Sequence, residues 1–347
     1  MEDVQSTRFN TNSFEGLTAI QDVFHYWALA LPSYIRPTNP NIPRIISVGG
    51  GKGGVGKSLI SANLASKLAK HKKRVLLVDL DIGSSNLHTY LSVGSIRYHL
   101  SDYLKNKVSF ASILSPTLSP NIAFIPGDKD SDILKLINTN PEVSTNFWTN
   151  LFNTKQNYGV DFIILDLGAG NLQCICDFFS LCHLGILTVI PEPSSIENAY
   201  SFLKTYIWSF SVNVLEKLGQ YQLSKKVQEQ LPGFAPCKSY SYLDYLEDLI
   251  GQELTTYIRS SFNTRLVAPL INETRYSDDG KISEVMSYTI RHYFGLQSQS
   301  IGQIAYDEIT WKSMRKKGLL VKDFPYSQFS KNLDQVASNI CNFFGYR

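Results

Sequence analysis

Residues 49–58 read Gly-Gly-Gly-Lys-Gly-Gly-Val-Gly-Lys-Ser, and this stretch decides the fold. Four of its residues have the spacing of a phosphate-binding loop: Gly51, Gly56, Lys57 and Ser58. The loop lies between an apolar run at 44–48, interpreted as a strand, and a helical pattern at 59–69. Because strand, loop and helix follow in the order that this motif requires, the stretch predicts a site for nucleotide phosphates.

The glycines of the loop let successive backbone N–H groups converge on phosphate oxygens, since no Cβ stands in the way. We expect Lys57 to reach the β- and γ-phosphates and the Ser58 hydroxyl to ligate Mg²⁺. The other loop residues expected to contact the nucleotide are Gly51, Lys52, Gly53, Gly54, Val55 and Gly56.

A second lysine, Lys52, follows the first glycine of the motif, where an ordinary phosphate loop needs none. The string at 52–58 resembles the deviant Walker A loop of the MinD/ParA class of ATPases. This resemblance implies ATP and Mg²⁺ as ligands and a homodimer with ATP sandwiched between two protomers. It also implies that Lys52 reaches the partner's phosphates and joins Lys57 in catalysis.

The rest of the chain predicts an α/β fold. Seven apolar runs lack clean alternation, which suits parallel strands buried on both faces. They lie at 45–48, 75–78, 122–125, 162–165, 185–190, 266–271 and 301–305. Helical stretches lie between most of them, so we expect a doubly wound, mostly parallel sheet of the P-loop NTPase type.

The domain organisation is expected to have two parts. Residues 1–41 are predicted to form an N-terminal helix and a Pro-rich linker, and residues 42–347 the P-loop ATPase domain. About 75 residues separate the fifth and sixth apolar runs, more than a simple crossover needs. We interpret 206–263 as a mainly helical insertion, either a partner-binding surface or a helical cover on the sheet.

Two acidic sites follow the loop. Asp79 and Asp81 end the second apolar run, at positions that share one face in extended chain. They resemble the first switch of the family, which implies that Asp81 positions the attacking water and Asp79 supports the metal shell. Asp166, followed by Gly168-Ala-Gly170, resembles the Walker B aspartate and second switch. It implies a metal-bound water on Asp166 and close backbone approach to the γ-phosphate at Gly170.

Three further stretches refine the resemblance. Residues 191–200 resemble a Pro-Glu-Pro stretch of the flagellar-number ATPases FlhG and FleN and their MinD-like relatives. Asn272 resembles the strand-end asparagine whose amide reads adenine, and 304–307 resemble the loop that closes over the base. One departure is Gly168, where the family often has proline; we expect it to change loop stiffness more than chemistry.

Composition limits the expected partners and cellular location. The net charge is +3, and basic and acidic residues are interspersed, so the chain has no strong overall attraction for nucleic acid and DNA is not an expected partner. Five cysteines without disulfide spacing favour a reducing cytosol. The N-terminus lacks the pattern of a signal peptide, and no run of 18 apolar residues occurs, so a cytoplasmic location is expected.

A C-terminal apolar stripe leaves membrane contact open. Its members are Phe329, Leu333, Val336, Ile340 and Phe343. The stripe fits either a membrane-surface helix or the last core helix of the fold, but its polar face is poor in Lys and Arg. A peripheral membrane location is therefore an alternative, and weakly supported.

Three other functions would leave different residues in the sequence. An iron–sulfur carrier like nitrogenase iron protein would use cysteines beyond the second switch, where Cys174 and Cys176 stand. It also needs an earlier cysteine, and residues 1–173 contain none. A bacterial tyrosine kinase of this fold would end in a tyrosine cluster, whereas the tail holds only Tyr346. A nucleotide-dependent binding module without turnover would need neither Lys52 nor Asp81.

The sequence therefore predicts a Mg²⁺-dependent ATPase that dimerises with ATP and acts as a spatial regulator. Such a cycle can place or count flagella, a division site or a chromosome region, with an activating protein partner.

Overall fold

The structure is a computed structural model that describes residues 41–346, apart from 84, 92, 94, 129–132, 134–136, 138–139 and 171–172. The expected N-terminal helix and most of the Pro-rich linker lie outside the described residues.

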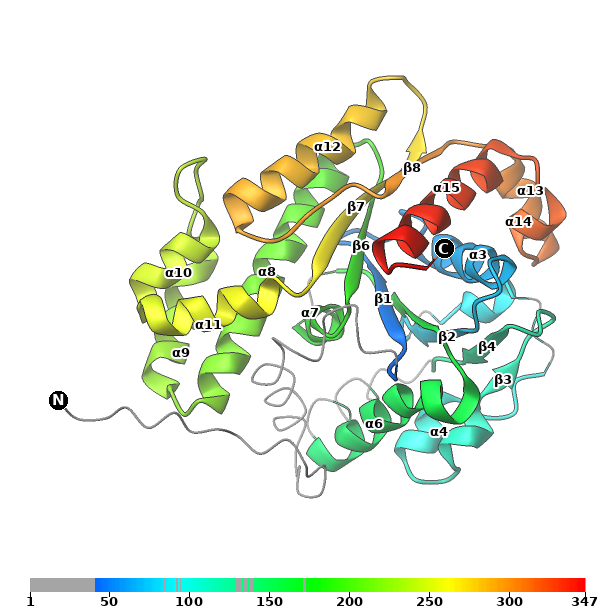
Figure 1. Ribbon diagram of the computed structural model, residues 1–347, viewed down its shortest axis with the longest axis horizontal. Coiled ribbons are helices and arrows are strands. Elements are labelled where there is room, and N and C mark those ends of the chain that lie inside the picture. Colours follow the sequence, from blue (N-terminus) through cyan, green and yellow to red (C-terminus); the bar gives the residue numbers. More distant parts are fainter. Residues whose placement is uncertain are drawn as a thin grey trace.

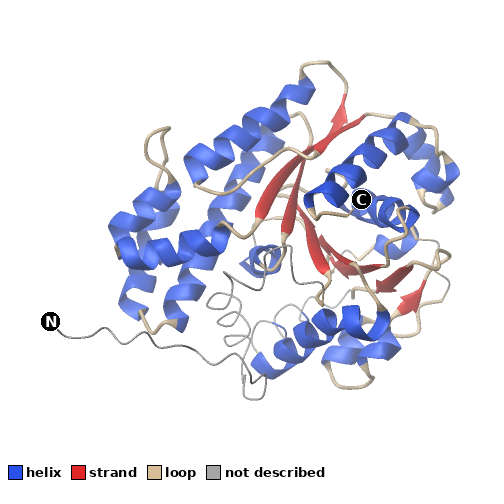
Figure 2. Ribbon diagram, in the orientation of Figure 1, coloured by secondary structure: helices blue, strands red, loops and turns tan. Residues whose placement is uncertain are grey.

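One sheet forms the centre of the described part (Figures 1 and 2). Its strands are β1 (Arg44–Gly49), β2 (Val75–Leu80), β3 (Ser115–Pro116), β4 (Ile122–Ile125), β5 (Phe162–Leu167), β6 (Leu184–Val189), β7 (Leu266–Thr274) and β8 (Gly302–Ala305). The order across the sheet is β3-β4-β2-β5-β1-β6-β7-β8. All neighbouring pairs are parallel except β3 and β4, which run antiparallel.

The seven apolar runs all form strands, so the predicted mostly parallel sheet is confirmed. Every residue of β1, β2, β5 and β6 is buried, which explains why these strands carry no alternating polar positions. The edge strand β3 was not predicted, because two residues ending in proline give no periodic signal.

Helices cover both faces of the sheet. They are α3 (Lys57–Lys70), α4 (Leu100–Leu104), α6 (Pro141–Tyr158), α7 (Gln173–Ser180), α8 (Pro193–Lys217), α9 (Tyr221–Gln230), α10 (Tyr242–Ile250), α11 (Gln252–Phe262), α12 (Asp279–Thr289), α13 (Ile309–Lys316), α14 (Leu320–Asp323) and α15 (Gln328–Phe343). One apolar core joins the sheet to α6, α7, α8 and α12, and a second joins its other face to α3, α14 and α15. This is the doubly wound arrangement that the sequence predicts.

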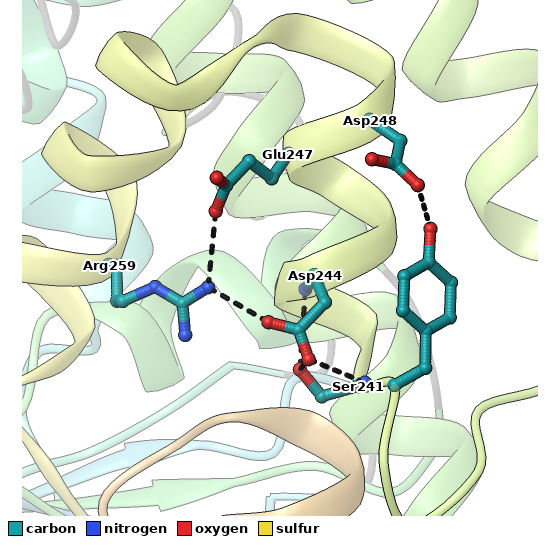
Figure 3. A network of polar contacts seen from close by, with 6 residues as sticks. Ser241, Asp244, Glu247, Asp248 and Arg259 are labelled. Atoms are coloured by element: carbon teal, nitrogen blue, oxygen red, sulfur yellow. Dashed lines mark hydrogen bonds and ion pairs between the residues drawn. The ribbon is translucent and has the colours of Figure 1, made fainter.

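The segment predicted as a helical insertion consists of α8 to α11 and lies at one side of the sheet (Figure 1). The expected boundary at 206 falls inside α8, which is continuous from Pro193 to Lys217. Figure 3 shows how α11 is tied to α10: the Arg259 guanidinium lies 3.2 Å from Asp244 and 3.7 Å from Glu247. The Ser241 backbone N–H donates to the Asp244 carboxylate at 2.8 Å, which caps α10.

Most of the C-terminal apolar stripe is buried in the core of the protein. Phe329, Leu333, Val336 and Ile340 are buried in the second core, where α15 packs on α3 and β8. Phe343 is partly exposed at the end of the helix. The stripe therefore serves as the last core helix of the fold. Across the described ranges, no helix combines the length and apolarity needed to cross a membrane.

Candidate nucleotide site

The loop between β1 and α3 turns in a way that requires glycine. Gly56 precedes α3 with φ of +92°, a left-handed conformation that other residues rarely adopt. At Gly51, an added Cβ would lie 2.0 Å from the backbone carbonyl oxygen of Asn198. The loop is therefore packed directly against α8, and its open side faces the carboxyl edge of the sheet.

The two lysines of the loop point in different directions. Lys57 is 7% exposed, and its Nζ donates to the Lys52 carbonyl at 3.2 Å. Burial lowers the pKa of Lys57, while the charges of Asp166 and Asp81 act to raise it. Lys52 reaches outward instead, with Nζ 2.9 Å from the Glu192 carboxylate and 3.2 Å from the Ser194 hydroxyl. One lysine thus faces the site and the other faces the start of α8.

The acids that end β2 and β5 are neighbours in the sheet. The register pairs Asp79 with Asp166, and both are buried. Burial raises the pKa of each carboxyl, and for Asp79 the neighbouring Asp166 charge raises it further. The hydroxyls of Ser58 and Ser61 lower the pKa of Asp166, and the Ser61 hydroxyl donates to it at 2.8 Å. These oxygens form a compact set of hard donors behind the loop.

Asp79 also holds the first switch. Its two carboxylate oxygens accept the backbone N–H groups of Asp81 and Leu87, each at 3.2 Å. The segment after β2 is thereby folded back over the strand end, which brings Asp81 to the mouth of the site. Burial raises the pKa of Asp81, and the Lys57 charge opposes this shift.

Gly168 of the second switch lies against Asp81. A Cβ at this position would be 2.9 Å from the Asp81 Oδ1 atom. Glycine at this position therefore leaves room for the carboxylate, in addition to the change in loop stiffness that the sequence predicts. Gly170 follows with φ of +100°.

A cavity of about 780 Å³ opens above the loop. Of the residues predicted to form the site, it is lined by Gly53, Gly54, Gly56, Lys57, Ser58, Asp81 and Asn272. Asp79 and Asp166 lie buried behind this lining. Gly51, Lys52, Val55 and Gly170 do not belong to it. The structure thus brings the phosphate loop, the first switch and the end of β7 together around one space.

Asn272 is a buried member of the cavity lining and is fixed by the loop. It is 3% exposed, and its Nδ2 donates to the Val55 carbonyl at 3.0 Å. The amide therefore uses one donor on the loop itself and turns its Oδ1 acceptor away from that carbonyl.

Several cavity residues escaped the sequence analysis. They are Tyr90, Glu273, Arg275, Thr310 and Trp311. Glu273 has φ of +60°, and a bulge interrupts the pairing of β7 with β8 beside it. This kink redirects the chain after Asn272 and brings Arg275 to the cavity. In the sequence, the only hint of these residues is the short resemblance at 304–307 to the loop that closes over the base.

The cysteines that follow the second switch do not line the cavity. Cys174 is partly buried, Cys176 and Cys182 are buried, and burial raises the pKa of all three thiols, that of Cys182 to about 11. Within the described ranges, no group of three or more His, Cys, Asp or Glu side chains is placed to hold a metal ion.

The fold and the loop geometry define a P-loop NTPase fold with a doubly wound sheet. The chain belongs to the CobQ/CobB/MinD/ParA nucleotide binding domain family, whose model matches residues 46–320.

Known proteins agree with this assignment. The chain is 32% identical over 166 residues to the flagellum site-determining protein YlxH of Helicobacter pylori, covering 48% of this chain and 54% of that protein. It is 29% identical over 162 residues to the antiactivator FleN of Pseudomonas aeruginosa, covering 46% and 55%. The chain thus spans about half the length of these relatives.

The fold is also that of MinD from Pyrococcus horikoshii OT3, a septum site-determining protein solved in complex with Mg-ADP. The TM-score is 0.56 at 19% identity, and the match covers 88% of this chain and 98% of that one. The predicted resemblance to the MinD/ParA class, with FlhG- and FleN-like relatives, is confirmed.

Proposed function

We propose that this protein is a Mg²⁺-dependent ATPase that dimerises with ATP and regulates the position or number of a cellular structure. The observation that carries the proposal is the convergence of Lys57, Ser58 and Asp81 on one cavity at the carboxyl edge of the sheet. Membership of a nucleotide-binding family and the Mg-ADP complex of the Pyrococcus protein support ATP and Mg²⁺ as the ligands.

The residues present suit a magnesium nucleotide. An added Cβ at Gly54 would meet nothing within 4 Å, so the loop leaves open space where phosphate oxygens would lie. The Ser58 hydroxyl would ligate Mg²⁺, and the carboxylates of Asp79 and Asp166 would hold its water shell. When bound, the metal would neutralise charge on the phosphates.

The remaining steps depend on side chains. Lys57 would bind the β- and γ-phosphates, and Asp81 at the cavity mouth would orient the attacking water. The Asn272 Oδ1 acceptor suits the exocyclic amino group of adenine, while one of the two Nδ2 hydrogens is held by the Val55 carbonyl.

Dimerisation would use Lys52. In the protomer this lysine pairs with Glu192, and the two side chains are 36% and 54% exposed. An ion pair this exposed contributes about 0–1 kcal/mol, so releasing Lys52 towards a partner's phosphate costs little. Binding of a phosphate across a desolvated interface would outweigh that loss.

The relatives indicate the biological role. YlxH is named as flagellum site-determining and FleN as an antiactivator, so flagella are the first structure to examine. An activating protein partner and a cytoplasmic or peripheral membrane location complete the proposal.

Turnover and partner can be tested with Asp81→Ala. We expect the parent to release phosphate from Mg-ATP and the variant to bind ATP while its kcat falls by roughly 10²–10⁴-fold. Affinity capture from native cells with the ATP-trapped variant should then enrich the partner relative to Lys57→Ala, which lacks nucleotide. Equal turnover in parent and Asp81→Ala would contradict the role of Asp81.

A further inference from the structure

One tyrosine lines the nucleotide cavity beside the first switch and belongs to neither the phosphate-binding nor the metal-holding set. Tyr90 follows the short 3₁₀ helix Leu87–Thr89. It lines the same cavity as Ser58 and Asp81, and its ring packs on the second core. The residue is therefore half-buried and reaches the cavity from the segment that follows β2.

The phenol of Tyr90 is a hydrogen-bond donor near the buried acids. Burial raises its pKa, and the charge of Asp166 raises it further, so the phenol keeps its proton at neutral pH. Within the described ranges, the phenol makes no hydrogen bond to the protein. Because a half-buried tyrosine hydroxyl ordinarily has a hydrogen-bond partner, the partner that remains for Tyr90 is an acceptor inside the cavity.

The position of the segment selects the terminal phosphate as that acceptor. The inner phosphates of a nucleotide would lie on the loop amides, at the N-terminus of α3. Asp81 would orient the water that attacks the terminal phosphate, so it must stand beyond that phosphate. Tyr90 lines the cavity from the same segment as Asp81. A phosphate oxygen there would accept a charge-assisted hydrogen bond from the phenol.

The segment that carries Tyr90 is anchored on both sides of the ring. The Asp79 carboxylate accepts the backbone N–H of Leu87 at 3.2 Å, and the Leu87 carbonyl accepts the N–H of Tyr90 at 3.1 Å. Leu87 and Leu91 are buried in the core that includes α3. A bond from the phenol to a phosphate would add an anchor on the cavity side and stabilise the whole segment.

We propose that the Tyr90 phenol donates a hydrogen bond to the terminal phosphate of the bound nucleotide, so that residues 87–91 are held more tightly with ATP than with ADP. The inference rests on the proposed nucleotide-binding function and extends it, since the loop amides bind phosphates that ATP and ADP share. Tyr90 is thus a specificity-determining residue for the triphosphate.

Calorimetry with the full chain measures this discrimination. The probes are Mg-ADP and the Mg²⁺ complex of an ATP analogue whose β,γ-methylene bridge prevents hydrolysis. Tyr90→Phe removes only the phenol oxygen. It should weaken binding of the analogue by about 10- to 100-fold and leave the Mg-ADP affinity within about twofold.

Tyr103→Phe is the matched control. Its phenol is also half-buried, but it accepts a hydrogen bond from the Asn150 amide at 3.0 Å and does not line the nucleotide cavity. This variant should bind both probes as the parent does.

Hydrogen exchange gives a readout that a merely structural role of Tyr90 would not move. The backbone N–H groups of Leu87, Thr89 and Tyr90 are all hydrogen-bonded. Their exchange should be slower with the analogue than with Mg-ADP in the parent and in Tyr103→Phe. In Tyr90→Phe the two probes should give equal exchange.

The failure of this inference differs from that of the proposed function. If the parent binds neither probe, the proposed function is wrong and the inference fails with it. If Tyr90→Phe binds the analogue as tightly as the parent, or loses affinity equally for both probes, Tyr90 does not recognise the terminal phosphate and the nucleotide site stands. Equal exchange with the two probes in the parent would overturn the tighter hold on residues 87–91.

Discussion

The two ends of the cavity are built differently. The phosphate end consists of consecutive loop residues, packed on α8 through Gly51 and backed by the buried pair Asp79 and Asp166. The other end, called the base end because the proposed nucleotide would place its base there, is assembled from the ends of β7 and β8 and from α13, and its largest side chain, Trp311, is mostly exposed. Contacts at the phosphate end should therefore decide whether nucleotide binds, while those at the base end should decide which nucleotide binds.

The largest effect is expected from Lys57→Ala. The phosphates would lose a buried, positioned cation, and truncating one partner of such a charge pair lowers affinity by on the order of 100-fold or more. Calorimetry with Mg-ATP checks this, and Lys70→Ala, an exposed lysine on the same helix, is the control that should bind normally. If Lys57→Ala binds Mg-ATP as tightly as the parent, the phosphate end does not decide whether nucleotide binds.

Gly168→Ala should affect turnover more than binding. The new Cβ would approach Asp81 Oδ1 to 2.9 Å and displace the carboxylate, while the phosphate loop stays intact. We expect kcat for ATP to fall roughly tenfold with little change in KM, since the loss concerns water orientation. Gly233→Ala, where a Cβ meets open space, should match the parent in steady-state kinetics. A parental kcat in Gly168→Ala would show that Asp81 does not act from this position.

A smaller effect should follow from a buried carboxyl between α7 and α8, away from both ends of the cavity. Asp177 on α7 accepts hydrogen bonds from Ser209 at 2.7 Å and Asn213 at 3.0 Å on α8. Burial raises its pKa from 3.8 to about 6, opposed by these donors and by the Lys217 charge. The folded carboxyl therefore prefers its proton, and the stability that this group contributes is greatest below pH 3.8 and is lost as the pH rises to about 6.

Asp177→Asn removes this titration while its amide oxygen can still accept from Ser209 and Asn213. The variant should gain on the order of 2 kcal/mol in free energy of unfolding at pH 7.5, and much less at pH 4.5. Urea denaturation at the two pH values measures the difference. An equal change at the two pH values would mean that the pKa of Asp177 is not raised in the folded protein.

The two ends also differ in how far the sequence predicts them. The phosphate loop depends on spacing within ten residues, and Asp79 and Asp166 each follow a recognisable strand pattern, so their meeting follows from the parallel sheet, whose strands end at one edge. Arg275 and Trp311 come from segments whose meeting depends on the bulge in β7 and on the packing of α13, which no local pattern encodes. Likewise, the contact of Lys52 with Glu192 joins positions 140 residues apart.

The sharpest test of the whole account is the oligomeric state with ATP, because a dimer gives Lys52 a role that a monomeric ATPase does not. Sedimentation of Asp81→Ala, in which ATP persists, should be compared with the double variant Lys52→Ala/Asp81→Ala at equal nucleotide occupancy. We expect an ATP-dependent dimer for Asp81→Ala and a dimer weakened by about 30-fold or more when Lys52 is also removed. Equal dimer fractions in the two proteins, or no dimer in either, would contradict it.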